Sequence, residues 1–190
     1  MTEKNKVTFG LEQCYYAKGT FDPVSGTVTY EAPKPYPGAV ELNLEINGEL
    51  IEFEADNIVY YTSADNKGYN GTLTAALVPD DFEQEILGEE VDEEDQVQTE
   101  VSNAKNSPFA FMFQFEGDVK ATRHVLYWCT ANRPGLGSST GKNPNTTEMS
   151  FNSTPRPSDK HVKTKTKETT PATIYDNWYK KVYEKEVSGG

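Results

Sequence analysis

The residues that could carry out chemistry in this chain are few, and they are poorly spaced for it. The loop Gly135–Lys142 superficially resembles a phosphate-binding loop, but five residues rather than four separate Gly135 from the Gly-Lys pair. Asn143 stands where Ser or Thr is needed. His124 and His161 have no Cys or His at the spacing of metal ligands. We therefore predict no catalytic residue, no metal and no cofactor, and expect a protein that is not an enzyme.

The two cysteines, Cys14 and Cys129, each lie in a strand-like aromatic context. Buried free thiols in a reducing compartment are the simplest interpretation. No apolar run approaches the roughly 20 residues of a membrane span. The N-terminal residues lack the apolar core of a secretory signal. We expect neither membrane insertion nor export.

The formal net charge of −12 is concentrated in one segment, because Asp80–Glu100 holds eleven acidic residues and no Lys or Arg. Lys163, Lys165 and Lys167 alternate with Val and Thr and predict a basic strand edge. That edge suits phosphate or nucleic acid, or a solvated strand that its lysines protect against aggregation. A third interpretation pairs it with the acidic segment of a neighbouring copy in head-to-tail association.

The stretch Phe109–Pro134 organises the predicted fold. It consists of two apolar runs joined by the polar tip Glu116–Thr122, with a Phe at every second position of the first run and apolar residues on both faces of the second. This pattern predicts a β-hairpin covered on both faces, either by a second sheet or by neighbouring subunits. Its candidate core residues are Phe109, Phe111, Phe113, Phe115, Val125 and Tyr127. We place Met112, Gln114, His124 and Trp128 on the opposite face from the four Phe residues, where they meet either a neighbour or the flanking C-terminal helix.

Val40–Ile46 alternates between apolar residues and the polar set Glu41, Asn43 and Glu45, which predicts a half-buried strand with an acidic polar face. Asn47-Gly48 predicts a hairpin turn after which Leu50–Ala55 returns along that strand. Further strands are expected at Val7–Ala17, Thr27–Tyr30, Ile58–Thr62, Thr72–Val78, Asn145–Phe151 and His161–Thr169.

Two helices are expected, a short one at Pro79–Leu87 and a terminal one at Ala172–Val187. Residues 31–39 are rich in Pro and should form an extended segment, either an arm that docks on a neighbour or a plain connector. Residues 89–107 should form a long mobile acidic loop. We predict a single domain over residues 1–190, mainly β, with a sandwich or barrel architecture and flanking helices.

Six segments, in their order and spacing, carry a resemblance that covers nearly the whole chain. They are VTFGLEQCYYA (Val7–Ala17), PGAVELNLE (Pro37–Glu45), ADNIVYYTSADNKGYNGTLTAALVPDDFEQEILG (Ala55–Gly88), GDVKATRHVLYWCTANRP (Gly117–Pro134), STPRP (Ser153–Pro157) and ATIYDNWYKKVY (Ala172–Tyr183). The chain resembles the major tail proteins of long-tailed bacteriophages (siphoviruses), in particular the phi13-type family.

The resemblance implies a structural virion protein with the β-sandwich tail-tube fold. Six copies form a ring, one sheet of each copy joins a continuous inner barrel, and stacked rings form the conduit for DNA ejection. It implies contacts with further copies and with tape-measure, tail-tip and tail-terminator proteins, assembly in the host bacterial cytoplasm and a final place in the virion tail. Neighbours would then supply the second cover of the apolar hairpin.

A lumen lined by Glu, Asn, Ser and Thr repels phosphates, whereas a basic wall binds DNA by counterion release. We therefore expect Glu41, Asn43 and Glu45 to face the lumen, and DNA to pass without sequence-specific binding. We expect the Pro-rich arm and the acidic loop at ring–ring contacts. The alternative function is a monomeric β-sandwich module that binds carbohydrate or protein through an exposed aromatic patch.

Overall fold

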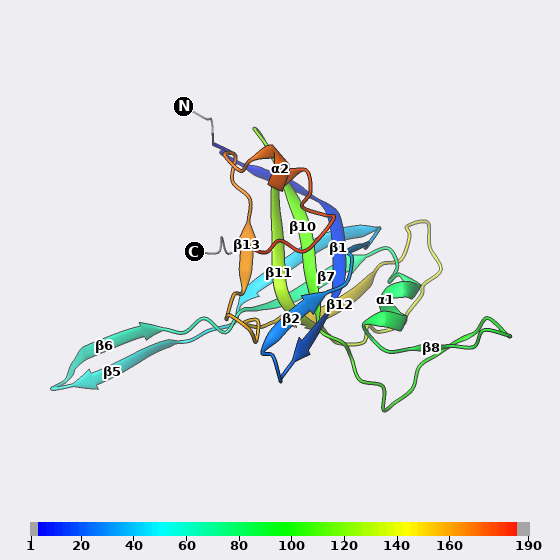
Figure 1. The fold of residues 1–190 in the computed structure, drawn as a ribbon, viewed down its shortest axis with the longest axis horizontal. Helices are drawn as coiled ribbons and strands as arrows, with labels where there is room; N and C mark the ends of the chain where they lie inside the picture. Colours follow the sequence, from blue (N-terminus) through cyan, green and yellow to red (C-terminus); the bar gives the residue numbers. More distant parts are fainter. Residues whose placement is uncertain (1–3, 186–190) are drawn as a thin grey trace.

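The structure, a computed structural model, describes residues 4–185 and is mainly β, which confirms the predicted class (Figure 1). Nine strands form one antiparallel sheet, and two further strand pairs lie outside it. The sheet contains β1 (Thr8–Asp22), β2 (Thr27–Tyr30), β3 (Lys34–Pro35), β4 (Ala39–Ile46), β7 (Tyr69–Ala75), β10 (Phe109–Gly117), β11 (Thr122–Ala131), β12 (Thr147–Ser153) and β13 (Lys163–Lys165). The separate pairs are β5 (Leu50–Ala55) with β6 (Ile58–Ala64), and β8 (Glu90–Val91) with β9 (Gln98–Thr99).

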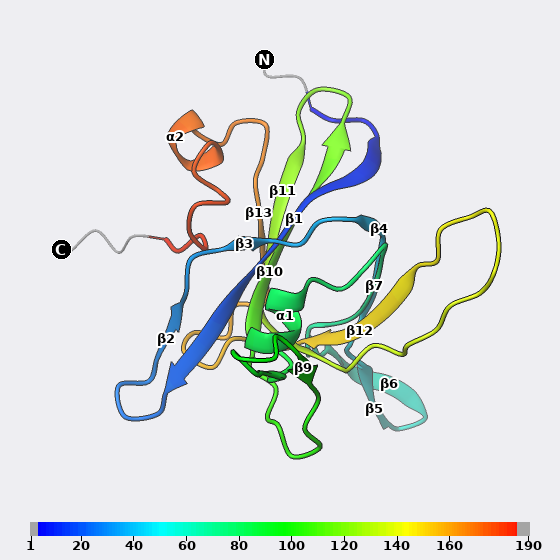
Figure 2. The same cartoon turned by 90° about the vertical axis from the view of Figure 1, so that its right-hand side faces the viewer.

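The main sheet runs in the order β2-β1-β10-β11-β12-β7-β4, and it branches at β11, which also pairs with β13, and at β1, which also pairs with β3. The first half of β11 pairs with β13, and its last three residues pair with β12. The sheet then folds over itself, because β3 pairs with β1 and leads directly into β4. Figure 2 shows the half made of β4, β7 and β12 crossing the half made of β1, β10 and β11, with α1 (Asp80–Glu85) beside them. The arrangement is sandwich-like.

The main core lies between these two halves. Phe109, Phe111 and Phe113 are fully buried there, as their period-two spacing on β10 predicts. Phe82 of α1 packs edge-to-face against Phe109, with ring centroids 5.3 Å apart. Phe151 of β12 lies over Gly71, where an added Cβ would meet the ring at 2.2 Å. Helix α1 and the two residues that follow it close this core with three buried side chains, Phe82, Ile86 and Leu87.

The other face of the β10–β11 hairpin is also covered, but from within the chain. Met112, Val125 and Tyr127 form a second cluster with Trp178 and Val182 of the C-terminal segment. Of the two covers expected for this face, a neighbouring copy or the C-terminal segment, the structure shows the C-terminal segment. Trp178 and Val182, which belong to the apolar stripe of that segment, are the residues that pack there.

The predicted terminal helix at Ala172–Val187 is largely absent. Helix α2 spans only Ala172–Tyr175, turns follow, and residues from 186 on lie outside the described part. Aromatic residues have modest helix propensity, and here Trp178 and Tyr179 pack flat on the sheet instead of lining one side of a helix. Neither described helix has the length or hydropathy of a membrane span.

The predicted turn at Asn47-Gly48 was wrong as well. Strand β5 does not return along β4, because β4 pairs with β7 and β5 pairs with β6. The chain reverses at Asp56 and Asn57, which both have positive φ (53° and 62°), as a two-residue primed turn requires. Residues 39–75 therefore form one long two-stranded hairpin with an interruption in its middle.

Candidate assembly surfaces

The predicted polar residues of β4 lie on an exposed sheet face. Glu41, Asn43 and Glu45 are exposed, while Leu42 and Leu44 are half-buried against the main core. The two sets therefore point to opposite faces of the strand, as their alternation requires.

Pairing extends this surface over two more strands, and we call it the acidic face. Glu41 lies opposite Thr74, Asn43 opposite Thr72 and Glu45 opposite Asn70 on β7. Residues directly opposite each other share a face of the sheet. The next strand adds Glu148, Ser150 and Asn152 in register with the same β7 residues. The period-two pattern of Thr147–Ser153 could have identified these three from sequence, but only the register shows that they continue the β4 face.

The acidic face carries three carboxylates, and β4, β7 and β12 contain no Lys or Arg. Its remaining side chains are Asn, Ser and Thr, which are neutral hydrogen-bonding groups. Such a surface presents a negative potential to solvent and no cation to a phosphate.

A second surface is the projecting hairpin, β5–β6, which extends far from the sheet (Figure 1). Its large apolar side chains are exposed: Leu50, Ile51, Phe53, Ile58, Val59, Tyr60 and Tyr61. Register places Phe53 opposite Tyr61 and Ile51 opposite Ser63 on one face. Glu52 lies opposite Thr62 on the other face. Clustered exposed apolar residues of this kind mark an interaction surface.

The root of the projecting hairpin is fixed by close backbone contact. Asn47 N–H donates to the Gly68 carbonyl (2.9 Å), and Asp65 N–H donates to the Glu49 carbonyl (3.0 Å). Gly68 has φ +105°, and an added Cβ would lie 1.8 Å from the Ser153 carbonyl oxygen. These contacts aim the hairpin in one direction from the sheet.

The hairpin residues predicted for the core occupy two different faces. Phe109, Phe111 and Phe113 are buried in the main core and Phe115 is half-buried at its rim, whereas Val125 and Tyr127 are buried under the C-terminal segment. Of the residues placed opposite the Phe side chains, Met112 lies there as expected.

His124 does not. It stacks on Phe113 at 5.1 Å between ring centroids, and therefore shares the face of the Phe residues. His124 lies directly opposite Phe113 in the pairing of β11 with β10, and residues opposite each other share a face. The sequence does not show that register. Burial, with the charges of Lys163 and Lys165, lowers the pKa of His124 to about 4, so its imidazole is neutral at pH 7.

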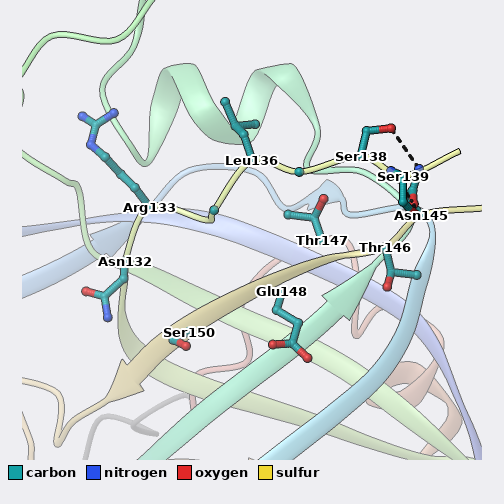
Figure 3. A pocket seen from close by; sticks show the side chains of 12 residues that line it. Asn132, Arg133, Leu136, Ser138, Ser139, Asn145, Thr146, Thr147, Glu148 and Ser150 are labelled. Atoms are coloured by element: carbon teal, nitrogen blue, oxygen red, sulfur yellow. Dashed lines mark hydrogen bonds between the residues drawn. The ribbon is translucent and has the colours of Figure 1, made fainter.

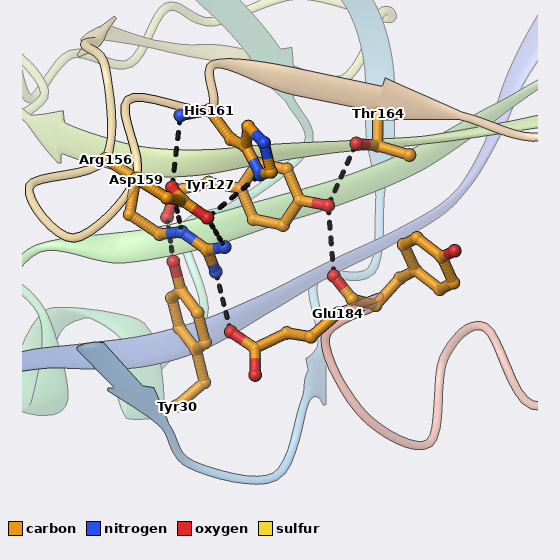
Figure 4. A network of polar contacts seen from close by, with 8 residues as sticks. Tyr30, Tyr127, Arg156, Asp159, His161, Thr164 and Glu184 are labelled. Carbon is orange, nitrogen blue, oxygen red and sulfur yellow. Dashed lines mark hydrogen bonds and ion pairs between the residues drawn. The ribbon is translucent and has the colours of Figure 1, made fainter. Parts of the chain in front are cut away.

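Two arginines hold the C-terminal segment on the sheet. Arg156 is 5% exposed, binds Asp159, and donates from Nη1 to Glu184 Oε1 at 2.6 Å, with its guanidinium 4.5 Å from the centre of the Tyr127 ring (Figure 4). Hydrogen bonding to Arg156 lowers the pKa of Asp159 to about 2. Arg123 lies 3.7 Å from the centre of the Tyr175 ring and also donates to that residue's carbonyl. We assign these contacts a structural role, because a buried charged side chain needs an oppositely charged or hydrogen-bonding partner.

The acidic loop is more ordered than predicted, because it contains the short β8–β9 hairpin. Gln98 Nε2 donates to Glu83 Oε2 (2.9 Å) and Glu89 Oε2 (2.7 Å), and Arg133 pairs with Glu89 and Glu100. We call residues 89–100 the acidic hairpin.

The Pro-rich arm packs on its own chain. Lys34 pairs with Tyr16 across β3 and β1, and its ammonium bonds Glu85 at 2.5 Å. Tyr36 is buried in the main core. This segment is therefore occupied within the subunit and is not a free arm.

The loop that resembles a phosphate-binding loop lines an open cavity of about 860 Å³ (Figure 3). Its lining includes Arg133, Ser138, Ser139 and Glu148, and Leu136 is its one large apolar side chain. Small-molecule sites are usually lined mostly by apolar and aromatic groups. No helix begins after Lys142, since the chain continues into β12, so the backbone lacks a helix N-terminus for a phosphate.

Within residues 4–185, no three His, Cys, Asp or Glu side chains are grouped to hold a metal ion. Burial raises the pKa of the Cys14 and Cys129 thiols to about 12, which leaves both thiols protonated and unreactive at pH 7. Comparison with known proteins adds no further site, because the chain matches no protein-family model and no curated protein.

Proposed function

We propose that this chain is a tail-tube subunit, which assembles with copies of itself into hexameric rings stacked as the conduit for phage DNA. The observation that carries the proposal is the projecting hairpin. It exposes a continuous set of large apolar side chains, and nothing in the described part of the chain covers them. A two-stranded ribbon is marginal in water by itself and gains stability when another surface covers it. A neighbouring copy supplies that cover.

The acidic face supports the conduit part of the proposal. A tube through which DNA slides needs a wall that does not retain phosphates, and a face with three carboxylates and no basic residue meets this need. Glu41, Asn43 and Glu45 would line the lumen together with Glu148, Ser150 and Asn152. The ring number, the tape-measure, tail-tip and tail-terminator partners, and the place in the virion tail come from the sequence resemblance.

Negative-stain electron microscopy of the concentrated protein tests self-assembly, and rings or hollow tubes are expected. Phe53→Ser with Tyr61→Ser should abolish them, because these substitutions remove the apolar face of the projecting hairpin. Val24→Ser with Leu136→Ser is the matched control, since both residues are highly exposed elsewhere (94% and 97%). Tubes that survive the hairpin substitutions and fail with the control would contradict the proposal.

A specific observation also favours the alternative, a monomeric protein-binding module. The exposed Phe53, Tyr60 and Tyr61 are residue types that anchor protein interfaces. Sedimentation velocity separates the two functions. Two results together would favour the module. The protein would stay a monomer at every concentration and salt, and one other virion protein would bind the wild-type chain but not the variant with Phe53→Ser and Tyr61→Ser.

A further inference from the structure

The outer edge of β13 is an unpaired strand edge with a row of lysines. This strand pairs only with β11, through Lys163–Leu126, Thr164–Val125 and Lys165–His124. No strand in the described part of the chain lies on its other side. An unpaired edge invites another chain, and lysines both protect it and select an acidic partner.

The lysines of this edge have no carboxylate partner among the residues that the structure describes. Lys163, Lys165 and Lys167 are exposed, and none forms an ion pair within residues 4–185. The intervening threonines face inward, where Thr164 Oγ1 accepts from the Tyr127 hydroxyl at 2.9 Å and Thr166 Oγ1 accepts from Arg123 N–H at 2.9 Å. The edge is therefore anchored through its threonines. The Lys163 ammonium lies 4.6 Å from the centre of the Tyr69 ring, and Lys165 and Lys167 are the exposed lysines that the test uses.

The acidic hairpin has complementary charge and an ordered tip. Asp92 Oδ1 accepts from the N–H groups of Glu94 (2.9 Å) and Asp95 (2.8 Å), and Gln96 Nε2 donates to the Glu93 carbonyl. The four acidic side chains of residues 92–95 are exposed, and exposed Val91 and Val97 flank them. An acidic tip flanked by apolar residues is suited to contact with a protein surface.

These two surfaces cannot meet within one subunit. Figure 1 shows β13 on one side of the sheet and the acidic hairpin projecting from the other, and Figure 2 keeps them apart. We infer that the acidic hairpin of one copy docks on the lysine edge of β13 of a second copy. Two different patches that join in this way form a head-to-tail contact, which closes into rings or continues as stacks. This inference rests on the proposed self-assembly and names two of its contacting surfaces.

Charge exchange tests this contact. The residues chosen have side chains that form no hydrogen bond or ion pair in the described structure. The hairpin variant is Glu93→Lys with Glu94→Lys, and the edge variant is Lys165→Glu with Lys167→Glu. Each should weaken self-association by about tenfold or more in low salt, because each sets like charges against each other. The fourfold variant retains the net charge of −12 and should restore association. An equimolar mixture of the two double variants should also associate.

The measurement is sedimentation velocity over a concentration series at low and high salt. Glu31→Lys with Glu116→Lys is the control of equal charge change for the hairpin variant, and Lys142→Glu with Lys180→Glu is that for the edge variant. Wild-type association that both double variants retain would overturn the docking contact and leave the tube proposal intact. A wild-type protein that never associates would overturn both. If the edge variant associates normally and loses only retention of duplex DNA, the partner of the edge is nucleic acid and the inference is wrong.

Carbodiimide cross-linking gives an independent measurement, because it joins a carboxylate directly to a lysine amine. A mixture of isotope-labelled and unlabelled protein distinguishes links between copies from links within one copy. Mixed-label peptides that join residues 92–95 to residues 163–167 are the expected product. Mixed-label links confined to other segments would contradict the inference.

Discussion

Two aromatic hairpins of this chain differ in how the rest of the chain covers them. The β10–β11 hairpin is buried on both faces, by the other half of the sheet on one side and by the C-terminal segment on the other. The projecting hairpin, β5–β6, is covered on neither face by the described residues. Both carry large apolar residues on each of their two strands. What distinguishes them is how much of the remaining chain packs against each. One hairpin belongs to the core of the subunit, and the other leaves its side chains exposed, as the proposed assembly requires.

A matched pair of substitutions gives the largest effect and tests this division directly. Phe111→Ala should lower the free energy of unfolding by about 3–5 kcal/mol, because it leaves a cavity in the main core. Phe53→Ala should change the stability of the subunit by less than about 0.5 kcal/mol and yet impair assembly. Urea unfolding and electron microscopy measure the two quantities. Equal loss of stability in both variants would end the distinction.

The covered hairpin should also respond to pH through His124. Its pKa of about 4 in the folded chain lies below the ordinary 6.5, so the unfolded chain binds the proton more tightly. Stability should therefore fall as pH decreases from 6.5 toward 4, by up to roughly 3 kcal/mol at about 1.4 kcal/mol per pKa unit. The contribution of Asp159, with a pKa of about 2, is lost only at lower pH.

Urea unfolding at several pH values measures this slope. His124→Phe should flatten it, since Phe keeps the stack on Phe113. Leu136→Phe is the control, because Leu136 is 97% exposed and the substitution changes no titratable group, and its slope should match that of the wild type. If the two variants behave alike, His124 does not carry the pH dependence.

The root of the projecting hairpin should be sensitive to one methyl group. Gly68→Ala is expected to cost about 2 kcal/mol, because Ala is strained at φ +105° and meets the Ser153 carbonyl. It should also misdirect the hairpin and reduce assembly beyond the loss in stability. Gly137→Ala, with nothing within 4 Å of the added Cβ, should leave thermal unfolding and assembly unchanged.

The smallest expected effect on stability is on the acidic face. Glu41→Lys with Glu45→Lys should leave the free energy of unfolding within about 0.5 kcal/mol of wild type, because both side chains are exposed. The assembled tubes should instead retain duplex DNA at low salt and release it at high salt, and DNA ejection should slow. Normal ejection and no retained DNA would remove Glu41 and Glu45 from the lumen.

Local patterns were sufficient for most strands and for helix α1. The alternation in Val40–Ile46 and Phe109–Phe115 determines which side chains share a face, and Pro79 followed by acids marks a helix start. Pairing partners were harder, because Asn47-Gly48 satisfies the composition of a turn. Its glycine instead allows close approach to the Asp65 carbonyl, 2.1 Å from an added Cβ.

Long-range contacts account for the remaining errors. The C-terminal segment was predicted as a helix because its apolar spacing fits one, whereas packing under Arg123 and Arg156 fixes it as turns. Of the three strands that form the acidic face, only β4 was predicted from sequence to contribute its polar residues. Glu148, Ser150 and Asn152 join it through register with β7, more than 70 residues earlier in the chain.

The interruption and bulge in the projecting hairpin have a consequence for the unassembled subunit. A long flat apolar ribbon promotes aggregation before its partner arrives. Here Tyr60 occupies a bulge that twists the ribbon, and Glu52 and Glu54 act as gatekeepers on its other face. Replacing the two glutamates would leave the folded body unchanged and shorten the time for which newly made copies stay in solution. Within the proposed assembly, the residues that resist aggregation therefore lie on the same hairpin as the exposed apolar surface.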